Sequence, residues 1–459
     1  MKLWKFISDR MERHPEQTVS DGASMYTFRD LLRFARSVAA ELSGENCCAV
    51  CCRSELLCGI AVLGCMAAGV TALPLSPKYG TSHVSHILHR VSPTAIITDC
   101  DGEIGVMHIT DSSYTPPDTS PALIMCTSGT TGHPKGAMLS DENIITNLTD
   151  IAKYLPLDPS DRILISRPLY HSGVLTGEFL TALAAGSGVI FHSNSFTPPV
   201  ILKTVRERLV TVLGGTPTTL RMIARFASAR DVKSLRRIII SGECLRSGVA
   251  SEIRRAFPDA SIYHVYGLTE ASPRVAHLPP PLFDTHPEYV GVPLDSVEVR
   301  ILDADGRDAA PGEDGELVVR GGNVMMGYYN EPVMTSKAIS DGWLRTGDRA
   351  LMNGDGLIRI LGRCDDMIIR AGVNIYPQEI EDTLKSDPRV NEVLAFGFEG
   401  ACGTEEIGLR ICGNFNDESE VRTLCIGVLP KFAVPSRIEL TDHIELSGSG
   451  KVIRGRRND

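Results

Sequence analysis

Residues 127–136, Thr-Ser-Gly-Thr-Thr-Gly-His-Pro-Lys-Gly, bring four hydroxyl groups, three glycines and one lysine together directly after a short apolar run. Such a segment offers many hydrogen-bond donors, a flexible backbone and one positive charge, which suits a phosphate chain. An ordinary Gly/Ser/Thr turn between a strand and a helix is the alternative, and composition alone does not decide between the two. The P-loop pattern G-x-x-x-x-G-K-[ST] is excluded, because Pro134 stands where its second glycine belongs and Gly136 follows Lys135.

The composition is typical of a soluble globular protein, with 43% hydrophobic and 22% charged residues. The 459 residues exceed one ordinary domain, so we expect two or three structural units. The net charge of −10 disfavours nucleic acid as a general partner. Residues 1–16 carry charges throughout and lack the apolar stretch of a secretory signal, so we expect a cytoplasmic protein.

Thirteen cysteines in a chain without an export signal are expected to be reduced thiols. The cluster at 47–52, Cys-Cys-Ala-Val-Cys-Cys, could form a metal site, but adjacent cysteines on a strand point to opposite faces of a sheet. A buried strand of small apolar side chains is the favoured interpretation. The charge-free stretch 56–75 is long enough to cross a bilayer, yet three glycines and a proline interrupt it. We expect a buried helix of about three turns, then a strand at 70–75, and no membrane span.

Helical and strand patterns alternate over the first 290 residues or so. Thr27-Phe-Arg-Asp30 has the form of a helix start, and apolar residues then recur every three to four positions up to residue 42. Short apolar runs that we predict to be strands lie at 49–52, 95–98, 122–126, 189–191, 210–213 and 237–241, with helical patterns such as 142–154 between them. This alternation predicts an α/β protein with layers of buried, largely parallel strands.

The pattern changes at about residue 291. Alternation with period two at 296–306 and a short strand at 315–321 predict a β-rich subdomain over about 291–362. Beyond Arg363 the predicted elements are a helix at 377–385, strands at 393–397 and 407–412, a helix at 418–429 and a strand at 437–440. We therefore expect a large N-terminal domain over 1–362 and a small α+β domain over 363–459, joined by a short hinge.

Five further stretches follow the opening loop in a fixed order. They are Pro-Leu-Tyr-His-Ser-Gly at 168–173, Tyr-Gly-Leu-Thr-Glu at 266–270, Trp-Leu-Arg-Thr-Gly-Asp at 343–348, Gly-Arg-Cys-Asp-Asp at 362–366 with its continuation to Glu381, and Ser-Gly-Ser-Gly-Lys at 447–451. Together with the loop they closely resemble the adenylate-forming superfamily of acyl- and aryl-CoA synthetases, peptide-synthetase adenylation domains and firefly luciferases. The resemblance covers nearly the whole chain.

This resemblance implies a reaction and a domain movement. ATP and a carboxylic acid would bind between the large domain and a small mobile C-terminal lid. The acid would become an acyl-adenylate with release of pyrophosphate, and the acyl group would then pass to the thiol of coenzyme A, giving an acyl-CoA and AMP. Cations and hydrogen-bond donors are needed, because two unit charges 4 Å apart repel by about 4 kcal/mol at an effective dielectric constant near 20.

The resemblance also implies roles for residues that would bind the nucleotide. The loop residues expected at the β- and γ-phosphates are Thr127, Ser128, Gly129, Thr130, Thr131, Gly132 and Lys135. The remaining nucleotide residues would be Gly242, Glu243, Tyr266 along the adenine with Gly267, Thr269 at the α-phosphate, Glu270 as the Mg²⁺ ligand, Asp348 at the ribose hydroxyls and Arg363 at ribose or phosphate. Taken alone, Tyr266 would be a core aromatic residue and Asp348 a turn residue.

The C-terminal motifs would serve the two half-reactions. Lys451 is expected to bridge the substrate carboxylate and the α-phosphate, although it also belongs to a basic tail that could simply be solvated. Asp365 lies at the family's hinge position, for which a polar linker is the alternative. Rotation about it would present Lys451 for adenylation and the strand near Gly372 for entry of the thiol.

The acid would bind beside His171, Gly214, Gly267 and Arg274, with His171 controlling access of thiol or water. Amino-acid-activating relatives carry an aspartate at the start of the pocket helix. The matching stretch 171–178 has none, so an α-amino acid is disfavoured. Arg274 could pair with a second acidic group, as a succinylbenzoate-type diacid would offer, or it could face solvent.

Two departures from the family pattern concern the thiol step and the adenine side. Residues 241–245, Ser-Gly-Glu-Cys-Leu, lack a second glycine that many relatives carry, and Asn374 stands near a position that is often basic. Two alternatives to a CoA ligase stay open. One is an enzyme that loads the acid onto a phosphopantetheinyl carrier protein, and the other is a non-catalytic nucleotide-binding protein.

Overall fold

The computed structural model describes residues 2–77, 81–127, 135–192, 197–364, 368–370, 373–375, 377–399 and 405–444. Several residues with predicted roles lie outside these ranges, namely Ser128, Gly129, Thr130, Thr131, Gly132, Asp365, Gly372 and Lys451.

The sheet that carries the opening loop has seven strands in the order β18-β8-β7-β4-β3-β5-β6. Its parallel centre consists of β7 (Leu123–Thr127), β4 (Thr71–Pro74), β3 (Cys47–Cys51) and β5 (Ala95–Cys100). The antiparallel strands β8 (Lys135–Leu139), β18 (Gly327–Tyr328) and β6 (Glu103–His108) complete its two sides. The pairing of β7 with β8 holds Thr127 opposite Lys135, so the two ends of the opening loop are neighbours.

Two helices against this sheet follow from local sequence. Helix α2 (Phe28–Glu41) begins at Thr27, whose hydroxyl accepts from the Asp30 N–H while the Asp30 carboxylate accepts from the Thr27 N–H. Helix α3 (Glu55–Ala68) is buried along most of its length and is about a turn longer than predicted. A Cβ at Gly64 would lie 2.5 Å from Val38 Cγ1, so glycine lets α2 and α3 approach closely. Among the described residues, no helix is long and apolar enough to cross a membrane.

The second sheet has nine strands in the order β15-β14-β13-β12-β11-β9-β10-β1-β2. Six neighbouring strands run parallel, namely β1 (Thr18–Ser20), β10 (Gly188–Phe191), β9 (Arg162–Ile165), β11 (Val212–Gly215), β12 (Arg237–Ile240) and β13 (Ser261–Gly267). The antiparallel strands are β2 (Met25–Thr27), β14 (Arg274–Leu278) and β15 (Val292–Pro293). The prediction of an α/β protein with largely parallel sheets is confirmed.

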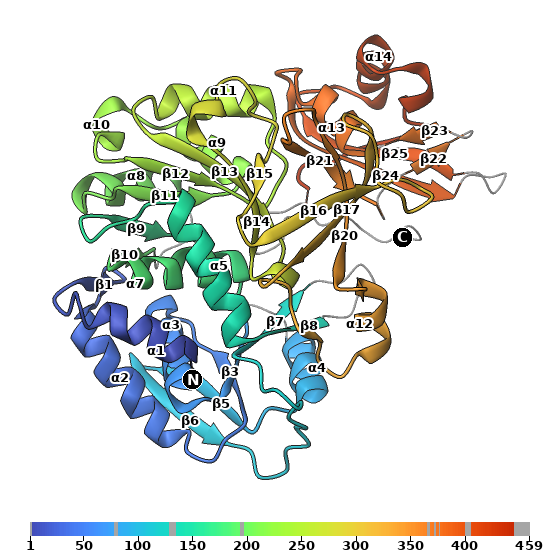
Figure 1. Cartoon of the computed structure of the whole chain (residues 1–459). Helices are drawn as coiled ribbons and strands as arrows, with labels where there is room; N and C mark the ends of the chain where they lie inside the picture. The colour runs from blue at the N-terminus through green and yellow to red at the C-terminus, as the bar shows by residue number, and fades with distance from the viewer. Residues whose placement is uncertain are drawn as a thin grey trace.

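Helices cover both faces of the nine-stranded sheet (Figure 1). A hydrophobic cluster on one face contains side chains from α8 (Pro198–Glu207), α9 (Pro217–Ala224) and α11 (Ser247–Ala256). A larger cluster joins the other face to the seven-stranded sheet through α1 (Lys2–Met11), α3, α5 (Asp141–Tyr154) and α7 (Thr181–Ala185). Burial of these apolar faces therefore fixes the two sheets relative to each other.

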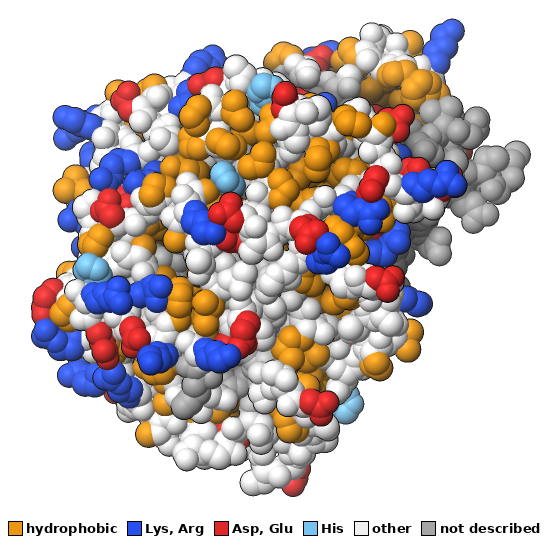
Figure 2. All heavy atoms as spheres, in the orientation of Figure 1, with side chains coloured by type: hydrophobic (Ala, Val, Ile, Leu, Met, Phe, Trp, Pro, Cys, Tyr) orange, Lys and Arg blue, Asp and Glu red, His pale blue; other side chains and the backbone are white. Residues whose placement is uncertain are grey.

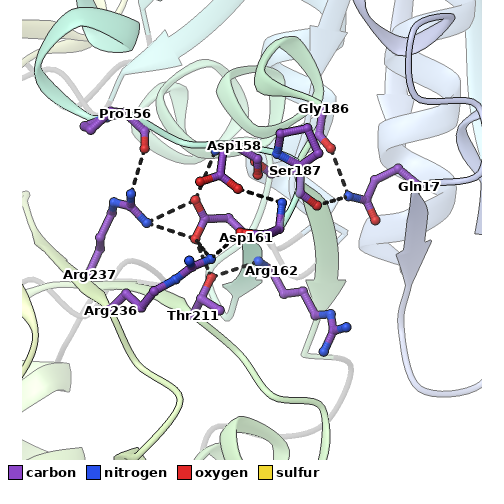
Figure 3. Close-up of polar contacts among 12 residues, drawn as sticks. Gln17, Pro156, Asp158, Asp161, Arg162, Gly186, Ser187, Thr211, Arg236 and Arg237 are labelled. Atoms are coloured by element: carbon purple, nitrogen blue, oxygen red, sulfur yellow. Dashed lines mark hydrogen bonds and ion pairs between the residues drawn. The ribbon is translucent and has the colours of Figure 1, made fainter.

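A buried carboxylate ties together the starts of three parallel strands (Figure 3). Asp161, directly before β9, has no exposed side-chain surface. Its Oδ1 accepts from Thr211 Oγ1 at 2.7 Å, from Arg236 Nη2 at 2.7 Å and from Arg237 Nη1 at 2.9 Å. Thr211 precedes β11, and Arg237 begins β12. Because these strands are parallel, their carboxyl ends lie together at the opposite end of the sheet.

The expected β-rich region forms a five-stranded antiparallel sheet. Its members are β16 (Val297–Leu302), β17 (Asp314–Gly321), β19 (Ile339–Ser340), β20 (Trp343–Met352) and β21 (Ile358–Arg363), and helix α12 (Pro332–Ala338) precedes β19. Basic and acidic side chains are interspersed over the face in Figure 2. Lys2–Glu142 and Arg29–Glu16 are examples of exposed ion pairs of this protein. Such pairs contribute little to stability, so the cores above hold the fold.

The C-terminal part has its own hydrophobic cluster, whose residues all fall between Ile368 and Ile438. It contains the hairpin β22 (Ile368–Arg370) and β23 (Val373–Ile375), helix α13 (Pro377–Leu384), the sheet β24 (Val390–Glu399), β25 (Glu405–Gly413) and β26 (Arg437–Leu440), and helix α14 (Glu418–Val428). Each predicted element of this part is present. The domain boundary at 362/363 stays a prediction, and it falls at the end of β21.

Candidate active site

The motifs that follow one another in the sequence also meet in space, because the carboxyl ends of the parallel strands bring several of them to one side of the sheet. Tyr266 and Gly267 end β13, Gly242 and Glu243 follow β12, and Gly214 lies at the end of β11. His171 follows β9 and caps the short helix α6 (Ser172–Val174). Crevices outside the carboxyl ends of parallel strands are the usual ligand sites of α/β sheets.

A cavity of about 670 Å³ lies at this edge, within the range of small-molecule sites. Six of the predicted nucleotide residues line it: Gly242, Glu243, Tyr266, Gly267, Asp348 and Arg363. The C-terminal part lines the other side of the cavity with Gln378, Glu381, Lys385, Asp442 and His443, to none of which the sequence assigned a role. The cavity thus lies between the two parts of the chain, where the resemblance placed ATP.

Asp348 is held by two residues of the predicted set. Its Oδ2 accepts a short hydrogen bond from the Tyr266 hydroxyl, and its Oδ1 accepts from Arg363 Nη1 at 3.0 Å. Burial and the charge of Asp348 raise the pKa of Tyr266, so the phenol remains a donor. A carboxylate offers about four lone-pair sites, and these contacts use two of them. Two sites remain, which matches the two hydroxyls of a ribose.

Glu243 offers an acceptor on the wall of the cavity. Its Oε2 accepts from the Thr218 hydroxyl at 2.8 Å and from the Thr218 N–H at 3.2 Å. Its Oε1 is buried without a hydrogen-bond partner among the described residues. Gly242 has φ +93°, which favours glycine at this turn. A ligand with an amino group would satisfy the unpaired oxygen.

Tyr328 links the cation and the carboxylate predicted at the phosphate end. Lys135 Nζ lies 5.3 Å from the centroid of its ring, and its hydroxyl donates to Glu270 Oε1 at 2.9 Å. Burial and the charge of Glu270 raise the pKa of Tyr328. Tyr328 belongs to none of the sequence motifs, and its one local signal is the pair Tyr328–Tyr329 after Gly327.

Glu270 fits the Mg²⁺ role that the resemblance implies. Mg²⁺ in nucleotide sites is held by one or two carboxylates together with phosphate oxygens and water. The described part of the chain contains no group of three or more His, Cys, Asp or Glu side chains that could hold a metal ion. Glu270 is therefore the carboxylate that would hold the ion together with phosphate oxygens and water.

A hydrogen bond joins the phosphate side to the expected acyl side. Ser172 Oγ lies 2.9 Å from Thr269 Oγ1, across 97 residues of sequence. The loop that carries His171 is anchored by Glu55, whose Oε2 accepts from the Leu169 N–H at 2.8 Å. The contact of Ser172 with Thr269 and that of Glu55 with Leu169 could not be found from local patterns, because the partners are distant in the sequence.

The wall after His171 is unusual in its backbone and its charges. The π-helix Leu175–Leu180 continues α6, and such π segments frequently occur at functional sites. It contains Glu178, which forms a buried ion pair with Arg167. A Cβ at Gly214 would lie 2.7 Å from Glu178 Oε1, so glycine leaves room for this pair. The pair was not predicted from the sequence.

Arg274 does not face solvent, which was one of its two predicted environments. The residue is 4% exposed and lies at the start of β14. A register shift between Tyr266 and Gly267 pairs Gly267 with Arg274. A Cβ at Gly267 would lie 1.7 Å from Pro273 O, so only glycine fits there. Arg274 is thus adjacent to the nucleotide motif.

An ion pair connects the C-terminal part to the large domain near the cavity. Arg246, before α11, donates to Asp382 of α13. Burial raises the pKa of Asp382 and lowers the pKa of Lys385, which lies in the same region. The structure therefore holds α13 against the nucleotide side of the large domain.

Comparison with known proteins gives one family. The model of the AMP-binding enzyme family matches residues 7–329. A feruloyl-CoA synthase of Amycolatopsis sp is 32% identical over 421 residues, which cover 86% of this chain and 84% of the relative. A long-chain-fatty-acid–CoA ligase of Escherichia coli O157:H7 is 32% identical over 357 residues, which cover 74% of this chain and 62% of the relative.

A solved structure is similar over nearly the whole fold. The o-succinylbenzoate CoA synthetase from Bacillus subtilis, in complex with its acyl-adenylate intermediate, has a TM-score of 0.86 and 26% sequence identity, covering 97% of this chain and 96% of that chain. The same enzyme has also been solved in complex with ATP and a magnesium ion.

Proposed function

The chain belongs to the AMP-binding enzyme family, and from this premise we propose that it is an AMP-forming acid–CoA ligase. It activates a carboxylic acid with ATP and transfers the acyl group to coenzyme A. The observation that carries the proposal is the cavity in which Tyr266 and Arg363 both donate to Asp348 and which Glu243 also lines.

The chemistry proceeds in two displacements. In the first, a carboxylate oxygen of the acid attacks the α-phosphorus of ATP, the bond to the bridging oxygen breaks, and pyrophosphate leaves. In the second, the sulfur of coenzyme A attacks the acyl carbon, the bond to AMP breaks, and the thiol proton is lost to base or solvent. AMP is a far better leaving group than the oxide that the free acid would have to expel.

The described residues have distinct parts in the first step. Asp348 holds the ribose, and Tyr266 lies along the adenine while its hydroxyl keeps Asp348 in place. Thr269 donates toward the α-phosphate, and its bond to Ser172 fixes that hydroxyl relative to the acyl wall. Lys135 offsets charge on the outer phosphates, and Mg²⁺ held by Glu270 supplies further compensation when bound.

Residues outside the described ranges complete the proposal. Thr130 and Thr131 of the opening loop cradle the β- and γ-phosphates, and Lys451 bridges the two reacting groups. Rotation about Asp365 then exchanges Lys451 for the strand near Gly372, where the thiol enters. His171 controls access to the acyl group. The consumption of ATP and coenzyme A fits the cytoplasm, which we include in the proposal.

Exchange of labelled pyrophosphate into ATP tests the first step. We expect exchange that depends on a carboxylic acid and on Mg²⁺, across a panel of aliphatic, aromatic and dicarboxylic acids. Bound ATP without exchange for any acid would instead indicate a non-catalytic nucleotide-binding protein. The family assignment makes the catalytic outcome the expected one.

Mass spectrometry of the products tests the second step. With an acid that supports exchange, addition of coenzyme A should yield an acyl-CoA and AMP. A phosphopantetheinyl carrier protein offered under the same conditions serves as the comparison. Acylation of the carrier, with no thioester of coenzyme A, would replace the CoA ligase by a carrier-loading enzyme.

A further inference from the structure

The backbone of Arg274 is fixed by two fully buried amides. Asn147 of α5 donates from Nδ2 to the Arg274 carbonyl at 2.8 Å and accepts from the Arg274 N–H at 3.2 Å. Asn323 donates to the same carbonyl at 2.9 Å. Both asparagines are 0% exposed. The starting point of the arginine side chain is therefore rigid.

The guanidinium of Arg274 lies on the pocket helix that follows His171. Its Nη2 donates to the Gly173 carbonyl at 3.4 Å, which is a long hydrogen bond. A Cβ at Gly177 would lie 2.9 Å from Nη2, 3.1 Å from Cζ and 3.3 Å from Nε. The planar group thus rests over a glycine in the π-helix, and a larger residue at 177 would displace it.

This guanidinium has no counter-charge in the described part of the chain. No described Asp or Glu oxygen lies within ion-pair distance of it, and its Nε is buried without a hydrogen-bond partner. The nearby Glu178 is occupied by Arg167. Tyr154 contacts the group, but burial raises the pKa of this phenol, so it supplies no negative charge. A fully buried and unpaired cation is costly unless a partner arrives.

We propose that Arg274 is the receptor for a second carboxylate on the acid substrate, so that the enzyme activates dicarboxylic acids at the carboxylate remote from this arginine. The inference rests on the proposed function and narrows its substrate class. The backbone of Arg274 pairs with Gly267, two residues before Thr269, and its guanidinium lies against Gly173 and Gly177 of the segment that follows His171. One carboxylate of the acid then reaches the α-phosphate, while the other pairs with the guanidinium of Arg274, whose Nε has no hydrogen-bond partner among the described residues.

A purely structural role for Arg274 makes a different prediction. In that case the side chain would only fill space between α5 and the π-helix, and uncharged acids would be the better substrates. A side chain that only fills space needs no charge. A leucine or a methionine would fill this space without the free-energy cost of burying a cation. The charge and the unpaired Nε are what the diacid receptor explains.

The test compares acids that differ by one charge. Pyrophosphate exchange of the wild-type enzyme is measured with aliphatic and aromatic diacids and with the monomethyl ester of each, which keeps the skeleton and removes one carboxylate. We expect at least one diacid to exceed its ester in kcat/KM on the order of 100-fold, because a site built for a polar group strongly rejects the analogue that lacks it. Equal or better use of the esters throughout would overturn the inference but leave the ligase function standing.

Two variants assign the preference to this arginine. Arg274→Met should raise KM for the preferred diacid about 100-fold, with a much smaller change in KM for the ester. Gly177→Ala should weaken diacid binding in the same direction because its Cβ displaces the guanidinium. Gly248→Ala is the matched control, since a Cβ there meets nothing within 4 Å.

Each result of the variants has a defined meaning. Loss of diacid preference in Gly177→Ala supports the inference even if Arg274→Met does not fold. A preference that survives in folded Arg274→Met would overturn it. Absence of exchange with every acid in the wild-type enzyme would instead contradict the proposed function itself.

Discussion

Asp161→Asn tests whether the two ends of the parallel strands in the nine-stranded sheet have separate roles, one in stability and the other in ligand binding. Asp161 has no exposed side-chain surface and accepts from Thr211, Arg236 and Arg237, which lie at the starts of β11 and β12. Its Oδ2 also accepts from the Asp158 N–H at 3.0 Å. Asparagine keeps the shape but removes the negative charge, and its NH₂ group cannot accept the bonds that one carboxylate oxygen now receives.

The expected loss follows from the exposure of the partners. Breaking a buried ion pair costs about 3–5 kcal/mol. Arg236 is 45% exposed and can regain water, whereas Arg237 is 15% exposed and cannot do so fully. We therefore expect a loss near the lower limit, about 3 kcal/mol in the free energy of unfolding. With an unfolding entropy of about 2.1 cal/mol/K per residue, a domain of some 360 residues should lose about 4 °C in Tm.

Thermal unfolding by circular dichroism and steady-state kinetics at 20 °C are the two assays. Tm should fall while KM for ATP and kcat stay at wild-type values, because the cavity lies at the opposite ends of the strands. Asp295→Asn is the matched control, since this exposed carboxylate pairs with exposed Lys153 and should leave Tm unchanged. A Tm of Asp161→Asn equal to that of the control would refute the role of Asp161 in stability. A large change in KM for ATP would show that the two ends of the strands do not have separate roles.

Three further predictions concern the nucleotide, the lid and acid pH. Asp348→Asn removes the charge that the ribose hydroxyls would meet and should raise KM for ATP about 30-fold, equivalent to about 2 kcal/mol; an unchanged KM would contradict the ribose role. Lys451→Ala should abolish pyrophosphate exchange yet still form thioester from pre-made acyl-adenylate, and equal loss of both steps would argue against a lid that serves them in turn. Burial lowers the pKa of His264 to about 4, below the value near 6.5 in the unfolded chain, so this group makes stability fall as pH drops through that window. The fall attributable to it between pH 7 and 5 is about 2 kcal/mol, and His264→Gln should flatten the dependence of Tm on pH; identical profiles would show that His264 is not responsible.

Local signals account for the elements that the sequence predicted well. The reciprocal bonds of Thr27 and Asp30 act over three residues, and the helix predicted from them starts at Phe28. The strand predicted at 437–440 has the same bounds as β26. The strand predicted at 210–213 instead lies at 212–215, because β11 continues through two glycines that pair with Ile239 and Ile240 of β12. Neighbouring strands, which the local sequence does not reveal, supply those hydrogen bonds.

The sequence by itself determined the family, the α/β class, the order of the motifs and the residues expected to meet the nucleotide, because each motif carries its chemistry in a few adjacent residues. The tertiary structure alone decided which distant side chains touch. Tyr266 and Asp348 are 82 residues apart, and Ser172 and Thr269 are 97 apart. The place of Arg274 beside Gly177 depends on strand order and on a register shift between β13 and β14. The contact of Tyr328 with Glu270 spans 58 residues of sequence. Burial and charge pairing are properties of the packed chain. No local pattern could therefore have shown that the guanidinium of Arg274 is buried without a carboxylate partner among the described residues.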